Sequence, residues 1–146
     1  GGSCIGIDAA ANMIRIAQRK RQGQNCTFQV AAAESLPFSD GYFDCVVSSM
    51  FFHHVQLDLK LAALTESYRI LKPGGRLVIA DMHVPTTLMG KLVSHTARWF
   101  FFFFLIAENT RGVLPSLIET AGFACPSIVK TYLGYIAVFT TAKESI

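Results

Sequence analysis

The sequence predicts an α/β fold: a mainly parallel sheet flanked by helices, with a C-terminal antiparallel hairpin. Short apolar runs alternate with amphipathic helical patterns over residues 4–80, and strands that alternate with helices usually form a parallel sheet. Two more strand-like runs follow near the C-terminus and are joined near Leu133-Gly134. No internal repeat or low-complexity linker divides the chain, so we expect one domain over residues 1–146.

The first half of the chain contains three expected strands and one helix. Met13, Ile16 and Ala17 recur at helical spacing, so they form the helix face that we expect to be buried. The third strand is apolar on both faces, as in a strand of a parallel sheet that is covered on both sides. The strands are Cys4–Ile7, Thr27–Val30 and Cys45–Ser49, and the helix is Asn12–Lys20.

The second half begins with an amphipathic helix at Leu57–Leu71. The residues LKPGG at 71–75 are expected to end this helix, because one proline and two glycines follow one another there. The strand that follows ends at a carboxylate, Asp81. The later expected elements are the strand Arg76–Ala80, a helix at Gly112–Ala121 and the two strands of the terminal hairpin.

Composition and charge exclude several classes of function. The formal net charge of +3 is small, and no lysine or arginine run lies beside interleaved aromatic residues, so nucleic acid is not an expected partner. The densest basic patch, Arg19–Gln24, is interpreted as a solvated helix end. The run ARWFFFFFLIA at Ala97–Ala107 has an apolar core of about half the ~20 residues that span a bilayer as a helix, so no transmembrane span is expected.

The phenylalanine run has three possible roles. It can belong to the core, which is the commonest place for such residues. It can line an apolar substrate pocket. Residues Trp99–Phe104 can also contact a membrane surface, which would suit a lipid-like substrate.

The four cysteines predict no disulfide and no zinc site. None of them forms a CxxC pair, and Cys4 and Cys45 fall in strands that we expect to be buried. We therefore expect reduced, buried thiols in a cytoplasmic protein. No secretory signal is visible, and the chain does not begin with methionine, so we expect an incomplete segment.

Asp8 follows the first expected strand and has two possible roles. A carboxylate at the carboxyl end of a buried strand can accept hydrogen bonds from both ribose hydroxyls of a nucleotide. It can equally cap the helix that follows, because aspartate is a favoured N-cap residue. Further along, the small side chains of Ala32 and Ala33 would let the backbone approach a flat purine.

Four motifs in register resemble a known family. The stretches IGIDAAANMIRIA, AAESLPFSDGYFDCVVSSMFFHHV, RILKPGGRLVIAD and LIETAGF occur in the order and spacing of class I S-adenosylmethionine-dependent methyltransferases. The chain most resembles the group that includes the ubiquinone/menaquinone-biosynthesis C-methyltransferases. This resemblance implies a Rossmann-like domain that uses S-adenosylmethionine.

The resemblance also implies roles for individual residues. Asp8 matches the acidic residue that binds the ribose hydroxyls. Ala33 matches the position whose backbone N–H meets the adenine, with Glu34 beside it. Ser48 and Ser49 match the end of the strand that faces the methionine moiety of the cofactor.

Two features depart from the family pattern. Many members carry aspartate where this chain has Ala32, so adenine recognition should be weaker here. The family's first strand and its glycine-rich loop, approximately D-x-G-x-G-x-G, do not precede Gly1, and we expect them upstream in sequence not present here. In the family that strand lies between those matching Cys4–Ile7 and Cys45–Ser49, so we expect a gap within the sheet.

The histidines are weak candidates for catalysis. His53 and His54 are adjacent and point different ways on a helix or strand, with no acidic or cysteine partner at ligand spacing, so no metal is expected. His54, or His83 just after Asp81, is a candidate general base. His95 is interpreted as ordinary helix surface.

The sequence therefore predicts S-adenosylmethionine-dependent methyl transfer to a small or lipid-like acceptor. One alternative is a non-catalytic remnant or interaction module that cannot bind the cofactor by itself. A partner chain or a second copy could then complete the sheet. An NAD-dependent oxidoreductase is a further alternative, although no GxGxxG motif is present.

Overall fold

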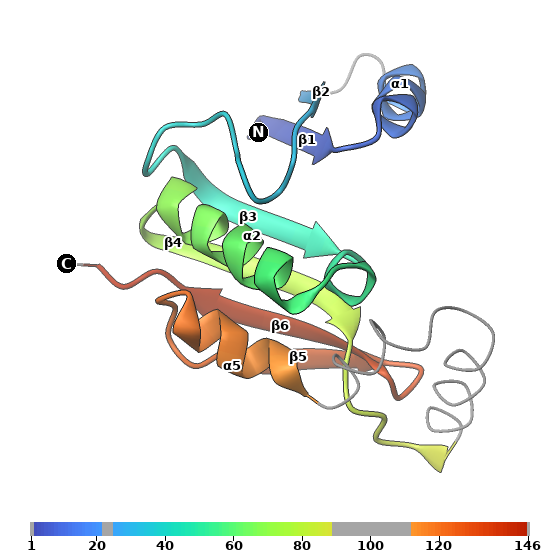
Figure 1. The fold of residues 1–146 in the computed structure, drawn as a ribbon, viewed down its shortest axis with the longest axis vertical. Coiled ribbons are helices and arrows are strands. Elements are labelled where there is room, and N and C mark those ends of the chain that lie inside the picture. The colour runs from blue at the N-terminus through green and yellow to red at the C-terminus, as the bar shows by residue number, and fades with distance from the viewer. Residues whose placement is uncertain (1, 22–24, 89–111, 146) are drawn as a thin grey trace.

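The computed structural model describes residues 2–21, 25–88 and 112–145, and it has the expected α/β fold (Figure 1). His95, the run Ala97–Ala107 and the end of the basic patch lie outside the described residues. The described elements, in chain order, are β1 (Cys4–Asp8), α1 (Ala11–Lys20), β2 (Cys26–Val30), β3 (Phe43–Ser49), the 3-10 helix η1 (Phe52–His54), α2 (Leu57–Ile70), β4 (Leu71–Met82), α5 (Val113–Thr120), β5 (Ser127–Tyr132) and β6 (Ile136–Ala142).

The described strands form two sheets. Strands β1 and β2 pair in parallel, and a separate four-stranded sheet has the order β3-β4-β6-β5. Within it β3 and β4 are parallel, while β6 runs antiparallel to both β4 and β5. No described strand pairs with the second edge of β1 or of β3. The expected gap within the sheet is therefore present between these two edges.

The core lies between the four-stranded sheet and the two helices, α2 and α5, that cover one of its faces (Figure 1). Along β4 the buried residues alternate, as the two-residue period of a strand requires. The fully buried members include Leu64 of α2, Leu77 of β4 and Ile118 of α5. Each such side chain contributes roughly 1.5–3 kcal/mol by leaving water.

Two expectations about buried faces are wrong. In α1 the buried residue is Ile14, while Met13 and Ile16 are exposed. The side chain of Gln18, one turn beyond Ile14, donates to the carbonyl of Phe28 at 3.2 Å, so this side of the helix rests on β2.

The expectation that β3 is buried on both faces is also wrong. Val47 keeps 70% of its surface exposed, and Cys45 is exposed. The reason is that β3 forms an edge of its sheet and α2 covers only one face of it among the described elements. An apolar strand pattern cannot distinguish cover on both faces from cover on one.

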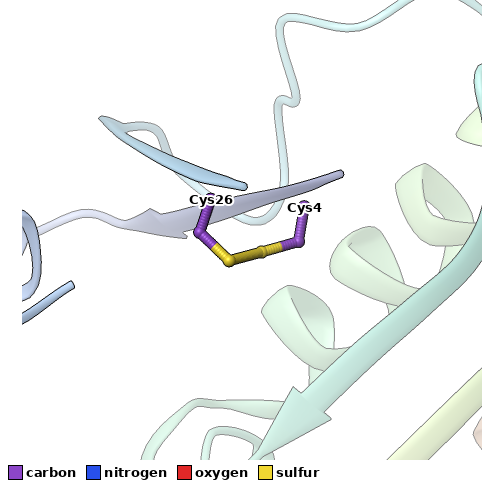
Figure 2. The surroundings of a disulfide bond; sticks show 2 residues. All are labelled: Cys4 and Cys26. Carbon is purple, nitrogen blue, oxygen red and sulfur yellow. A yellow bond between two sulfur atoms is a disulfide. The ribbon is translucent and has the colours of Figure 1, made fainter. Parts of the chain in front are cut away.

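The expectation of reduced, buried cysteines is wrong as well. Cys4 and Cys26 face each other in the register of β1 and β2 and form a disulfide (Figure 2). Cys45 and Cys125 are free thiols, but both are exposed. Adjacent strands bring the Cα atoms of Cys4 and Cys26 to 4.7 Å, a pairing that a separation of 22 residues did not reveal.

The turn signals of the second half are confirmed. Gly112 and Gly122 flank α5 with φ of 80° and 101°, a region that favours glycine. Three residues separate β5 from β6, and two of them, Leu133 and Gly134, have positive φ. The N–H of the third, Tyr135, donates to the carbonyl of Tyr132 at 3.2 Å and closes the turn. This backbone matches a type I′ hairpin turn, whose twist suits antiparallel strands.

Candidate functional site

The candidate residues lie where the parallel strands end. In Figure 1 β1 and β3 run in the same direction, so their carboxyl ends face the same side of the molecule. Asp8 is the last residue of β1 and is exposed. Its Oδ1 accepts a hydrogen bond from the backbone N–H of Ala10 at 2.7 Å.

Asp8 is not the N-cap residue of α1. The N-cap position is Ala10, which has no side-chain cap. The Asp8 carboxylate instead stabilises the turn that leads into the helix, and its exposed position leaves it open to a ligand. Of the two roles considered for Asp8, capping in the strict sense is therefore wrong.

The segment after β2 carries the next two candidates. The backbone N–H of Ala31 donates to the carbonyl of Asp8 at 3.2 Å, which joins this segment to the end of β1. Ala33 is partly buried against the main core, and Glu34 is exposed. A bridge between Ala32 and Ser35 makes a tight turn of this stretch, so Ala33 lies on a fixed backbone.

Two side chains of α2 hold the loop that follows. Glu66 Oε2 accepts the backbone N–H of Leu36 at 2.7 Å. Arg69 donates to the carbonyls of Leu36 at 3.0 Å and Phe38 at 2.7 Å, and to the Asp40 carboxylate at 2.7 Å. Arg69 also makes two bonds to Glu66, at 2.7 and 2.9 Å. We call Glu66 and Arg69 the loop clamp.

The loop clamp changes the acidity of its own groups. Hydrogen bonds from Arg69 lower the pKa of Glu66 below its ordinary value, although partial burial opposes this. Hydrogen bonds to Glu66 and Asp40 raise the pKa of Arg69, so the guanidinium stays charged. The charged pair therefore remains intact around neutral pH. No local sequence pattern indicates the role of either residue, because their partners in the loop lie about 30 positions away.

The end of β3 carries Ser48, which is half-buried, and Ser49, which is exposed. Met50 follows with φ of 55°, a left-handed conformation that is uncommon for a residue other than glycine. Its backbone N–H donates to the carbonyl of Ala80 at 2.8 Å. The chain therefore turns sharply over the ends of β3 and β4 and leads into η1.

A buried carboxylate holds this turn from β4. Asp81 is fully buried, and its Oδ2 accepts the backbone N–H of Phe52 at 2.7 Å. Its Oδ1 accepts the N–H of Met82 at 2.7 Å and lies 2.9 Å from Nδ1 of His53. The ring of His54 lies 3.8 Å from that of His53, measured between centroids. His53 is buried and His54 is exposed.

The two candidate bases have different surroundings. Burial and the neighbouring His53 lower the pKa of His54, while Asp81 opposes this by favouring its charged form. Burial also lowers the pKa of His83. The His83 ring packs edge-on against Phe139 at 5.1 Å, and its Nδ1 is buried without a hydrogen-bond partner among the described residues. Both imidazoles are therefore neutral near pH 7.

No helix in the described part of the chain is long and apolar enough to cross a membrane. Residues 2–21, 25–88 and 112–145 contain no group of three or more histidine, cysteine, aspartate or glutamate side chains that could hold a metal ion.

The arrangement places an exposed carboxylate, a small-residue turn and two serines after successive strands of an α/β fold. In α/β folds nucleotides commonly bind outside the carboxyl ends of the parallel strands. The site fits an adenosine group in two respects: Asp8 offers exposed carboxylate oxygens, and Ala32 and Ala33 add little bulk to the turn.

Residues 1–79 match the model of a family described as methyltransferase domain. The chain belongs to this family of class I S-adenosylmethionine-dependent methyltransferases, and the cofactor of the family is S-adenosylmethionine.

Similar proteins support this family assignment. The chain is similar to the demethylmenaquinone methyltransferase of Lactiplantibacillus plantarum, with 38% identity over 99% of this chain and 69% of that protein. It is 30% identical to the ubiquinone/menaquinone biosynthesis C-methyltransferase UbiE of Hahella chejuensis, over 97% of this chain. The chain spans 65% of the length of that relative, and matches to two others cover 35% and 40% of their lengths.

Solved structures support the fold. A SAM-dependent methyltransferase from Methanosarcina mazei superposes with a TM-score of 0.74 at 20% identity, over 99% of this chain and 83% of that one. At this identity the likeness concerns the fold alone.

Proposed function

We propose that the protein transfers a methyl group from S-adenosylmethionine to a small or lipid-like acceptor, and that the acceptor is a quinol-type aromatic ring. The observation that carries the proposal is the set of candidate residues at the carboxyl ends of β1, β2 and β3, in a chain of this family. The acceptor class follows the names of two relatives, which methylate demethylmenaquinone or act in ubiquinone and menaquinone biosynthesis.

In this proposal the cofactor is held by residues at the ends of β1 and β3 and by the segment after β2. Asp8 accepts hydrogen bonds from the ribose hydroxyls, because its carboxylate is exposed at the end of β1. The backbone N–H of Ala33 meets the adenine edge, and Glu34 lies beside it. The loop clamp supports this segment from α2. Ser48 and Ser49 face the methionine moiety.

When bound, S-adenosylmethionine supplies an activated methyl group and leaves as a neutral thioether. The chain's own residues then have to position the acceptor in line with that methyl group and exclude water. His54, exposed on η1 and neutral near pH 7, accepts the proton that the acceptor loses. His83 is the second candidate for this role, after β4.

The test is a transfer assay with methyl-labelled S-adenosylmethionine and reduced demethylmenaquinone. We expect label in the quinol, and we expect the His54→Ala variant to lose about 10²–10⁴-fold in rate, the usual contribution of a proton acceptor. Full turnover by His54→Ala and by His83→Ala would remove both from the mechanism. No label in the quinol or in a phenol of similar size would overturn the proposed reaction.

A second candidate function is an interaction module that does not bind the cofactor by itself. It is favoured by the second edges of β1 and β3, which pair with no described strand. Such edges present backbone N–H and C=O groups to a strand from a partner or a second copy. Titration with S-adenosylhomocysteine separates the two candidates, because the interaction module would bind none.

A cytoplasmic location stays a prediction, and one observation stands against it. Disulfides persist mainly in oxidising compartments, and Cys4–Cys26 is such a bond. Thiol labelling of the protein in intact cells tests this prediction. Labelling of Cys4 and Cys26 would support a cytoplasmic location, and protection of both cysteines from labelling would contradict it.

A further inference from the structure

The exposed imidazole of His54 stands on a segment whose other members are fixed. Phe52 and His53, which precede it in η1, are both buried. The N–H of His54 donates to the carbonyl of Phe51 at 3.0 Å, which closes the 3-10 turn. The start of this turn is tied to β4 through the bond from the Phe52 N–H to Asp81. A functional side chain is held in position when the backbone segment that carries it is rigid.

The contact between Asp81 and His53 determines which nitrogen of His53 carries hydrogen. A carboxylate only accepts hydrogen bonds, and Asp81 Oδ1 lies 2.9 Å from Nδ1 of His53. Nδ1 therefore carries the hydrogen, and in the neutral ring Nε2 holds the lone pair. The carboxylate itself cannot turn, because the backbone N–H groups of Phe52 and Met82 hold its two oxygens.

His53 cannot act on a substrate directly, because only 4% of its surface is exposed. Its ring instead lies against that of His54, with 3.8 Å between centroids and 42° between planes. The orientation that Asp81 imposes on His53 is thereby passed to His54. Among the described residues, the Nδ1 of His83, the other candidate base, has no hydrogen-bond partner, and its ring packs on Phe139.

We propose that Asp81 and His53 are positioning residues for His54, with Asp81 fixing the tautomer and orientation of His53 and His53 fixing the ring of His54. The proposal deepens the proposed function and rests on it for the role of His54 toward the acceptor. The positioning itself is a property of the folded chain and can be measured without cofactor or acceptor.

The first measurement is the nitrogen spectrum of the histidine rings in the ¹⁵N-labelled chain. We expect His53 as the Nδ1–H tautomer in the parent protein. In Asp81→Asn the amide replaces one acceptor oxygen with an N–H donor, so we expect His53 to lose that tautomer. Finding His53 as the Nε2–H tautomer in the parent protein would overturn the proposal.

The second measurement is the order of the His54 ring from ¹³C relaxation. We expect it to fall in Asp81→Asn and in His53→Gln. Ser67→Ala is the matched control, since it removes a buried hydrogen bond of α2, from Ser67 Oγ to the Ala63 carbonyl at 2.7 Å. We expect an unchanged His54 ring in this control. If the order of the His54 ring is unchanged in a variant that folds, the proposal is overturned.

Kinetics separate this proposal from the proposed function. We expect Asp81→Asn and His53→Gln to lower kcat about tenfold or more, with the KM for S-adenosylmethionine within about twofold, and Asp81→Glu to restore part of the loss. If the parent protein transfers no methyl group, the proposed function fails, and the ring measurements still decide whether Asp81 and His53 position His54.

Discussion

The unit formed by β1, α1 and β2 and the four-stranded sheet covered by α2 and α5 are stabilised in different ways. In the first unit Ile14 is the single apolar side chain that is buried among the described residues, and a disulfide joins the two strands. In the second, eleven buried residues form one cluster. The adenosine end of the proposed site therefore depends on a covalent bond, and the acceptor end depends on a packed core.

The largest expected difference between the two regions comes from truncating one buried side chain in each. We expect Leu64→Ala in α2 to lower the free energy of unfolding by about 2–5 kcal/mol, because it leaves a cavity in the main core. Ile14→Ala should affect mainly β1 and β2, because its face of α1 rests on β2. Urea denaturation combined with amide exchange measures both effects. Equal losses of global stability in the two variants would contradict the comparison.

Reducing the disulfide should loosen only the first unit. Closing a loop of this length, between residues 22 positions apart, contributes about 3 kcal/mol in the chain-entropy model. With a thiol reductant, or in the Cys4→Ser, Cys26→Ser double variant, we expect faster amide exchange in β1 and β2. The amides of α2 and β4 provide the internal control and should stay protected. Uniform acceleration over both regions would show that they are stabilised as one unit.

Breaking the loop clamp should weaken cofactor binding with a smaller effect on the core. Arg69→Ala removes bonds to two carbonyls and two carboxylates, so we expect the affinity for S-adenosylhomocysteine to fall about tenfold, or ~1.4 kcal/mol. Lys72→Ala is the control, because its ion pair with Asp44 is largely exposed and contributes little to stability. Equal affinities of the Arg69→Ala and parent proteins would remove the loop clamp from the binding site.

The smallest expected effect is a change in the titration of His54. Burial, and after it the neighbouring His53, lower the pKa of His54, and Asp81 raises it. His53→Gln should therefore raise the pKa of His54, and Asp81→Asn should lower it. The folded state disfavours protonated His54, because its pKa is lowered there. The contribution of neutral His54 to stability is therefore present above the ordinary histidine pKa of about 6.5 and is lost as the pH falls from that value through the lowered pKa of the folded state. The pKa of His54 is measured from the chemical shifts of its ring protons as a function of pH. If its pKa changed in the same direction in both variants, the assignment of these causes would be contradicted.

The sequence pattern predicted the elements of the larger region well. Leucine spacing placed the helix now observed as Leu57–Ile70, and the glycines around 112 and 122 placed the ends of α5. These signals are local: they depend on residues three to ten positions apart. The same kind of signal failed in α1, where Ile14 and not Met13 or Ile16 is buried, because the choice of face depends on what the helix packs against.

The candidate site was predicted only in part, for a related reason. Asp8, Ala33 and the two serines were assigned from motifs in register. They lie at the end of β1, in the segment after β2 and at the end of β3, respectively. The bonds from Asp81 to His53 and from Arg69 to the loop join residues about 30 positions apart, and no local pattern encodes them. The Cys4–Cys26 pairing was missed for the same reason.

The most direct test of the proposed cofactor site is an amide NMR titration of the chain with S-adenosylhomocysteine. We expect saturable shifts at Asp8, Ala33, Glu34 and the serines of β3. These shifts should be lost in Asp8→Ala and retained in Asp58→Ala, which changes an acidic residue at the start of α2. A folded chain without shifts at these residues would contradict the account, and would leave the interaction module as the function to pursue.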